Sequence, residues 1–323
     1  MPIVEISTYR APHLLTNGHL QTVYPKLFRR VGSGCPVRER LELDDGDFLD
    51  VDWHRAGGSR KVAVLSHGLE GNSASIYMRG MARCLNYHGW DVLCWNFRGC
   101  SEEMNRLARF YHSGDTDDLH TVLSHALAAR AYDHAALVGF SMGGNQILKY
   151  LGESPKRIPP ELVGAATFSV PCQLADAAFE IGRWFNRIYL MYFMWSLHKK
   201  VRMKAKRFPK QYSTEGLSGT MRFETFDDRF TAPLHSFASA QDYYEQSSSA
   251  RYLDTITVPT LLVQAVDDPF LPDSCYPRTQ AMASKHLVLE IPAHGGHVGF
   301  IEANTPPFYW SETRTVQFLE NLC

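Results

Sequence analysis

One stretch of sequence decides the fold, and it reads Ala135-Ala-Leu-Val-Gly-Phe-Ser141-Met-Gly-Gly-Asn-Gln-Ile-Leu-Lys-Tyr150. It begins with an apolar run of strand length and ends with a segment of helical composition, and Gly-x-Ser-x-Gly lies between them. Strand, sharp turn and helix form the context of a nucleophile elbow, in which a serine hydroxyl is held clear of a sheet. Gly139 and Gly143 leave room for such a turn. The pattern predicts that Ser141 is a nucleophile, and the alternative is an accidental glycine turn.

Apolar runs and helix-length segments alternate on both sides of this stretch. A hairpin is predicted around the turn Asp44–Asp47, because two alternating runs flank it. Strands alternating with helices indicate a parallel sheet covered on both faces. The predicted fold is the α/β-hydrolase fold, with a mostly parallel central sheet. The predicted strands are 37–43, 48–53, 62–65, 91–95, 135–140, 163–170, 259–266 and 286–291, and the predicted helices are 73–88, 115–130, 143–153, 274–284 and 311–322.

Residues 172–250 break the alternation, because they are helix-like and aromatic-rich and then become basic and loop-rich. We predict that they form a helical cap inserted into the hydrolase core. The expected division is therefore an N-terminal segment, hairpin and first core part at 1–171, the cap at 172–250 and the second core part at 251–323.

A serine nucleophile needs a base and an orienting acid, which follow it in the order Ser, Asp/Glu, His in this fold. His297 lies in a glycine-rich loop after the last predicted strand and is the expected base, with His294 as the competitor. Asp268, which follows the strand 259–266, is the expected acid, and Asp267 is the alternative. Both aspartates also suit an ordinary Asp-Pro turn.

The tetrahedral intermediate of acyl transfer needs amide donors. The expected donors are the N–H of Met142, directly after the nucleophile, and the N–H of Leu69 in the loop after the first core strand. Four further side chains are candidates for lining the site, and a purely structural role is the alternative for each. They are His67, Arg98, His112 and Asn145.

Composition bounds the remaining classes of function. The 323 residues are 45% hydrophobic and 21% charged with a net charge of -1, so there is no global field that would attract nucleic acid. Seven scattered cysteines without a C-x-x-C pair favour a reducing compartment over disulfides or a thiolate metal site. No secretory signal is recognised at the N-terminus. We expect a cytoplasmic protein without metal or cofactor; its oligomeric state is left open.

Six motifs together resemble the YheT-like branch of the α/β-hydrolases, which is related to the eukaryotic abhydrolase-domain esterases. The resemblance implies a Ser141, Asp268, His297 relay and hydrolysis of carboxylic esters, either short-chain or acylglycerol-like. Gly18 departs from the pattern, which has proline at that position. The resemblance spans residues 17 to 299. The six motifs are Asn17–Thr22, His67–Gly71, Asn96–Ser101, Tyr111–Leu119, Gly139–Asn145 and Asp267–Pro272.

The predicted cap carries two unusual stretches. Aromatic residues are dense between Phe179 and Trp195 and either line an acyl pocket or pack the cap on the core. Lysines and arginines without an acid follow from Lys199 to Lys210 and form either a solvated face or a weak peripheral contact with anionic headgroups. The expected ligand is a small-molecule or lipid ester. The alternatives are a thioesterase or amidase with the same triad, and a lipid-binding protein with a vestigial site.

Overall fold

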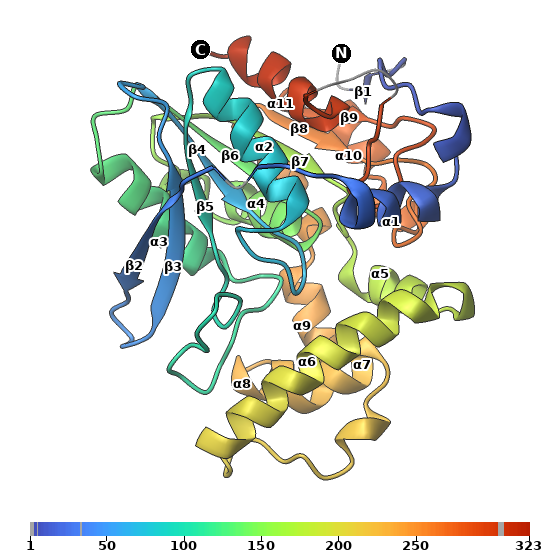
Figure 1. Ribbon diagram of the computed structural model, residues 1–323. Coiled ribbons are helices and arrows are strands. Elements are labelled where there is room, and N and C mark those ends of the chain that lie inside the picture. The colour runs from blue at the N-terminus through green and yellow to red at the C-terminus, as the bar shows by residue number, and fades with distance from the viewer. Residues whose placement is uncertain (1–2, 5, 33, 303–306) are drawn as a thin grey trace.

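The computed structural model describes residues 3–4, 6–32, 34–302 and 307–323, and these contain one nine-stranded sheet (Figure 1). The strand order is β1-β9-β8-β7-β6-β4-β5-β3-β2. Neighbours are parallel from β1 to β5, whereas β3 runs antiparallel to β5 and β2 antiparallel to β3. The strands are β1 (Ile3–Val4), β2 (Val37–Glu42), β3 (Phe48–His54), β4 (Lys61–Ser66), β5 (Asp91–Trp95), β6 (His134–Phe140), β7 (Leu162–Phe168), β8 (Thr260–Val263) and β9 (Leu287–Glu290).

Both faces of the sheet are buried, which explains why the central strands are continuously apolar. In β6, Leu137 packs into one hydrophobic cluster with Leu119 of α3 (Thr116–Ala128) and Ile147 of α4 (Met142–Glu153). Val138 points to the opposite cluster with residues of α2 (Ile76–Tyr87) and α11 (Trp310–Glu320). α10 (Arg278–Ala283) precedes β9. The predicted α/β-hydrolase fold is confirmed.

The segment between β7 and β8 contributes no strand to the sheet within the described residues, and we call residues 172–250 the cap segment. Its helices lie together at the bottom of Figure 1, away from the strands. They are α5 (Leu174–Ile181), α6 (Arg187–Arg207), α7 (Phe223–Phe226), a π-helix at Asp227–Thr231, α8 (Ala232–Leu234) and α9 (Ala240–Ser247). The boundaries of the three-part division stay a prediction.

Two N-terminal elements were not predicted. β1 has two residues, too few for a periodic signal, and it pairs with β9 at the edge of the sheet. α1 (Gly18–Phe28) is preceded by Asn17, whose side-chain oxygen accepts hydrogen bonds from the N–H groups of His19 and Leu20. This is an N-cap, and it lies within the first of the six motifs. Figure 1 shows α1 at the side of the core, above the start of the cap segment.

Candidate active site

Ser141 is the single residue between β6 and α4, and its backbone conformation is unusual for a residue other than glycine. Its φ is 53° and its ψ is -120°, and such conformations cost about 1–3 kcal/mol and concentrate at functional sites. The turn also requires close approach of the backbone from β4. A Cβ atom on Gly143 would lie 2.4 Å from the carbonyl oxygen of His67 and 2.6 Å from that of Ser66. Glycine at 143 is therefore a steric requirement of this elbow.

Three side chains that the sequence singled out form a hydrogen-bonded chain. The Oγ atom of Ser141 lies 2.9 Å from Nε2 of His297. Nδ1 of the same ring lies 2.9 Å and 3.1 Å from the two carboxylate oxygens of Asp268. Asp268 is buried, and its Oδ1 also accepts a hydrogen bond from the N–H of Phe270. The carboxylate therefore favours the tautomer that carries its proton on Nδ1, which leaves Nε2 free to accept one from Ser141.

The competing residues pair with one another instead. Nδ1 of His294 lies 3.3 Å from Oδ2 of Asp267, and the N–H of Gly296 donates to Oδ1 of Asp267 at 2.8 Å. Asp267 thus braces the loop that carries His297, and it makes no contact with the imidazole of His297 that the structure records.

The loop around His297 is held from two other parts of the chain. Thr22 of α1 accepts a hydrogen bond from the His297 N–H at 2.9 Å, and Ser169, after β7, accepts one from Val298 at 2.9 Å. The side-chain oxygen of Gln21 accepts one from the N–H of Ile301. Gln21 and Thr22 belong to the motif Asn17–Thr22, so this motif was the available signal for their role, which sequence reasoning did not assign.

Leu69 and Met142 border the same cavity as Ser141, as their expected role requires. The loop that carries Leu69 is fixed on both sides. The N–H of Gly68 donates to the phenol oxygen of Tyr77 at 3.0 Å, and the N–H of Glu70 donates to that of Tyr111 at 3.1 Å.

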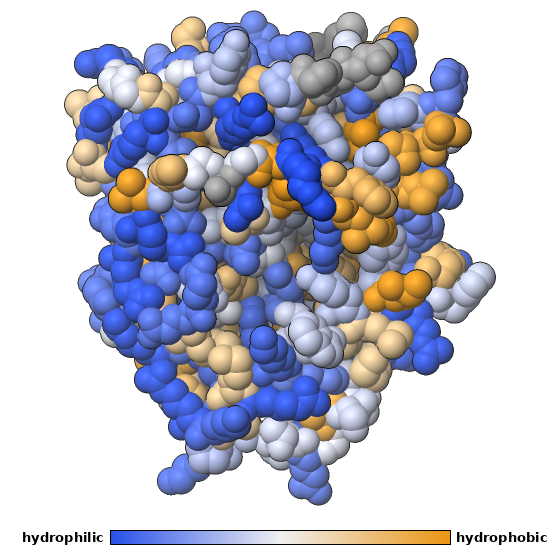
Figure 2. Space-filling view, viewed as in Figure 1, coloured by the Kyte–Doolittle hydropathy of each residue, from blue (hydrophilic) through white to orange (hydrophobic). Residues whose placement is uncertain are grey.

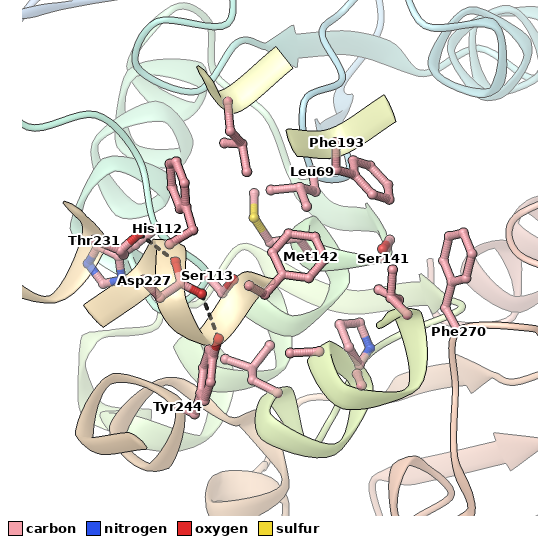
Figure 3. Close-up of a pocket in the computed structure, with 18 of the residues that line it drawn as sticks. Leu69, His112, Ser113, Ser141, Met142, Phe193, Asp227, Thr231, Tyr244 and Phe270 are labelled. Atoms are coloured by element: carbon pink, nitrogen blue, oxygen red, sulfur yellow. Dashed lines mark hydrogen bonds between the residues drawn. The ribbon is translucent and has the colours of Figure 1, made fainter. Parts of the chain in front are cut away.

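Two cavities meet at Ser141 and His297. The first, of about 100 Å³, lies under the cap segment and is lined mainly by apolar side chains, among them Phe193, Phe223 and Phe226 (Figure 3). The second, of about 370 Å³, opens between α1, α2 and α6 and has more polar walls. The second volume lies within the range of about 300–1,000 Å³ that is usual for small-molecule sites, and the first is smaller. The site can thus hold an apolar and a more polar group on opposite sides of Ser141.

The far end of the first cavity carries a carboxyl group that sequence reasoning missed. In Figure 3, Asp227 lies across the cavity from Ser141. Its two oxygens accept hydrogen bonds from the hydroxyls of Thr231 (2.5 Å) and Tyr244 (2.7 Å). Burial raises the pKa of Asp227 to about 6. A single aspartate in a loop-rich stretch gave no sequence signal for this placement.

Of the four lining candidates, His112 borders the first cavity, and the other three line neither of the two cavities. The His67 ring is fully buried and bridges the Gly68 carbonyl (2.7 Å) and the Phe97 N–H (3.2 Å), and burial lowers its pKa to about 3. Arg98 is buried in ion pairs with Asp45, Asp47 and Asp118. Asn145 is buried and bonds the backbones of Ser113, Ser247 and Ser249, which ties α4 to the end of the cap segment. Each of these side chains satisfies buried backbone groups or charges rather than facing a cavity.

The aromatic and basic stretches of the cap segment also divide by burial. Phe193 lines both cavities, and Tyr189 and Tyr192 line the second, whereas Phe179, Trp184 and Trp195 are exposed. In the basic stretch Lys200 and Lys204 are buried. Lys200 donates to a carboxylate oxygen of Glu70 at 2.6 Å, and Lys204 donates to the carbonyls of Asn105 and Leu107. The basic stretch is therefore not one continuous solvated face.

The described residues show two further negative findings. No three histidine, cysteine, aspartate or glutamate side chains among them are grouped as metal ligands would be. None of the described helices combines the length and the hydropathy that a membrane-crossing segment needs.

Comparison with known proteins agrees with this fold. The model of the α/β-hydrolase fold family matches residues 62–304, so the chain belongs to this family and is a hydrolase. Within it the chain belongs to the YheT-like branch. It is 36% identical to YheT of Escherichia coli (strain K12), which is named as a candidate esterase, over 94% of this chain and 90% of that protein.

Other relatives carry related names. The chain is 30% identical to phospholipase ABHD3 of Mus musculus, over 85% of this chain and 70% of that protein. Among solved structures, an esterase of Pyrococcus furiosus superposes with a TM-score of 0.60 at 18% identity, covering 89% of this chain and 91% of that one. At this identity the likeness concerns the fold alone.

Proposed function

We propose that this hydrolase cleaves carboxylic esters through an acyl-enzyme formed on Ser141. The observation that carries the proposal is the chain of hydrogen bonds from Ser141 Oγ through the His297 ring to Asp268. Such a chain lets a weakly nucleophilic hydroxyl attack a carbonyl while the imidazole takes its proton. The names of the esterase and phospholipase relatives agree with an ester substrate.

In the proposed mechanism, Ser141 Oγ attacks the ester carbonyl as its proton passes to Nε2 of His297. The Leu69 and Met142 amides donate to the oxyanion, and Asp268 stabilises the imidazolium. His297 then returns the proton to the leaving alcohol as the carbon–oxygen bond breaks. The same ring then deprotonates a water molecule, which attacks the acyl carbonyl. The bond between the acyl carbon and Ser141 Oγ breaks, Oγ takes the proton back from the ring, and the carboxylic acid leaves.

The two cavities suggest which part of the ester goes where. The first cavity is apolar and suits the acyl chain, and the second has more polar walls and suits the alcohol. This arrangement favours an ester with an apolar acyl group and a polar alcohol, as in short-chain esters or acylglycerol-like lipids.

The test is hydrolysis of p-nitrophenyl butyrate by Ser141→Ala, with Ser218→Ala, at an exposed position in the cap segment, as the matched control. Ser141→Ala should lower kcat by at least about 10⁴-fold without unfolding the protein, and Ser218→Ala should match the wild type. A fluorophosphonate probe should label the wild type and leave Ser141→Ala unlabelled. If the wild type neither hydrolyses esters nor takes up the probe, the site is vestigial and the proposal fails. If matched acyl-thioesters or amides are turned over faster than the ester, the proposed substrate class changes from esters to those compounds.

A further inference from the structure

The helix α1 presents its apolar residues to solvent instead of to the core. The residues that it buries are Gly18, Gln21 and Pro25. The outward stripe follows the spacing i, i+3, i+4, i+7, i+8, which is one face of a helix, and it reaches 54% exposure at Leu27 and 62% at Phe28. It consists of Leu20, Val23, Tyr24, Leu27 and Phe28. A surface helix normally turns this face inward, so the reversal requires an explanation outside the core.

The first half of α6 and the turn before it carry a second outward stripe. Its inner face packs on the core through Leu190, Met194 and Leu197. Its outer face has the same helical spacing and is exposed by 84% at Trp184 and 80% at Ile188. This stripe consists of Trp184, Ile188, Met191, Tyr192 and Trp195.

The two stripes lie side by side. The rings of His19 and Tyr189 are stacked at 5.8 Å, with a hydrogen bond of 3.1 Å between them, and the Lys26 ammonium lies 3.7 Å above the ring of Tyr192. Figure 2 shows hydrophobic side chains gathered over α1 and again at the start of α6. We call the two stripes together the α1–α6 face. Val23 and Tyr192 belong to this face and also line the second cavity, so the face borders the opening that leads to Ser141.

The charged residues on the two helices of this face have one sign. Neither α1 nor α6 contains an acidic residue. On α6 the outer stripe continues from Trp195 into exposed Lys199 and Arg202, which lie four and seven residues further along the same side. Lys26, Arg30 and Arg187 are exposed on the same two segments. Large apolar side chains with tryptophan and tyrosine, flanked by cations, form the pattern of an interfacial helix.

We propose that the α1–α6 face docks on an anionic lipid surface and brings the second cavity to that surface. Its cations complement anionic headgroups, and its apolar stripes reach below them. A second copy of this chain on the same face would repeat a cationic surface against a cationic surface and would cover the opening of the cavity. The docking element is thus the outward stripes with their exposed cations, because Lys200 and Lys204 of the basic stretch are turned inward.

The test compares co-sedimentation of three proteins with vesicles of equimolar phosphatidylcholine and phosphatidylglycerol. The first is the wild type, the second Leu27→Gln/Ile188→Gln and the third Tyr87→Gln/Met282→Gln, which changes two apolar side chains that are exposed elsewhere. Leu27 and Ile188 line neither cavity. All three proteins should therefore have the same melting temperature and hydrolyse a water-soluble ester at the same rate.

The wild type and the control variant should bind the vesicles, and less so at high salt, because salt screens the cations. Binding of Leu27→Gln/Ile188→Gln should fall at least about tenfold, since two apolar side chains no longer enter the lipid. The proposal is overturned if the wild type stays in the supernatant or if the face variant binds as well as the control. If the wild type and the control variant form a dimer, the face variant does not, and none of the three binds vesicles, the face is instead the contact with a second copy of this chain. Vesicle binding needs no catalysis, so its outcome is independent of the proposed esterase activity.

Discussion

At the scale of single residues, the site gathers unfavourable backbone conformations around the proposed nucleophile and the proposed base. Besides Ser141, the positive φ angles of non-glycine residues include 54° at Ser169, 63° at Val298 and 43° at Phe300. Ser169 and Val298 are hydrogen-bonded to each other beside His297. Because each such residue costs about 1–3 kcal/mol, the surrounding packing must hold both loops in place, which keeps Ser141 and His297 aligned before a substrate binds.

The two neighbouring aspartates should behave differently on mutation. Asp268→Asn removes the carboxylate that holds Nδ1–H of His297, so kcat for p-nitrophenyl butyrate should fall by about 10⁴-fold, as expected for a misplaced tautomer. Asp267→Asn keeps an oxygen for the Gly296 N–H and should stay within about tenfold of the wild type. Equal losses in the two variants would contradict the assignment of Asp268 as the orienting acid.

The sequence placed Ser141, Asp268 and His297 where the structure joins them, because each follows a strand and the strand ends of a parallel sheet meet at one edge. His67, Arg98 and Asn145 line neither cavity, since membership of a motif does not tell whether a polar side chain faces a cavity or a buried group. The residues that hold the His297 loop were missed for a related reason. Their contacts span more than 125 positions in sequence, and no local pattern records such a contact.

At the scale of elements, the start of α1 packs so closely on the loop of Asp267 that a side chain at position 18 would collide with it. A Cβ atom on Gly18 would lie 1.8 Å from the carbonyl oxygen of Asp267. The departure from proline at this position therefore coincides with a tight contact in this chain, and α1 is held against the loops rather than loosened from them.

Gly18→Ala should therefore lower the free energy of unfolding by about 1–3 kcal/mol, the usual cost of overpacking, and should lower kcat because Asp267 braces the His297 loop. Urea unfolding and ester hydrolysis measure the two effects. Gly32→Ala is the matched control, because a Cβ atom there would meet nothing within 4 Å. Indistinguishable unfolding curves for the two variants would show that α1 shifts freely.

Asp227, in the π-helix at the end of the first cavity, should make the stability of the protein depend on pH. The pKa of Asp227 is raised from 3.8 to about 6, so the folded protein binds its proton more tightly than the unfolded chain does. The stability that this group contributes is present below pH ~4 and is lost as the pH rises through about 6. Asp227→Asn cannot ionise and should become more stable relative to the wild type across this window, by up to about 3 kcal/mol.

Thermal unfolding of the wild type and Asp227→Asn between pH ~4 and pH ~8 measures this difference. The gap between the two melting temperatures should widen in favour of the variant as the pH rises. A constant gap would mean that the carboxyl group does not titrate in this range.

At the scale of the whole molecule, the cap segment and the core are joined by a buried ion pair beside the proposed oxyanion donor. Glu70 follows Leu69, and its carboxylate accepts hydrogen bonds from Tyr111 of the core and from Ser196 and Lys200 of α6. The pair therefore links the position of the cap to the loop that carries Leu69.

Lys200→Met would leave the Glu70 carboxylate buried without its cation, which costs about 3–5 kcal/mol in such pairs. We expect a lower free energy of unfolding and a lower kcat. Replacing both partners, as Glu70→Leu/Lys200→Met, should recover most of the stability. Lys206→Met, at an exposed position of α6, should change neither quantity. If the double variant is as unstable as the single one, the ion pair is not the source of the loss.

Most of the central sheet could be predicted from the sequence, because strands buried on both faces appear as short apolar runs. The arrangement of the cap segment could not, since its helices pack through contacts that periodicity does not specify. The outward stripes of α1 and α6 show the same limit, because an amphipathic pattern reveals that a helix has an apolar side but not which way that side faces.

The position of α1 also has a practical consequence. Family likeness marks the hydrolase region as beginning at residue 62, yet the side chains that fasten the histidine loop come from residues 21 and 22. A fragment cut at that apparent boundary would keep Ser141, His297 and Asp268 and still lose the hydrogen bonds that hold the loop around His297. Where such a protein is trimmed for study, α1 should be kept with the hydrolase region.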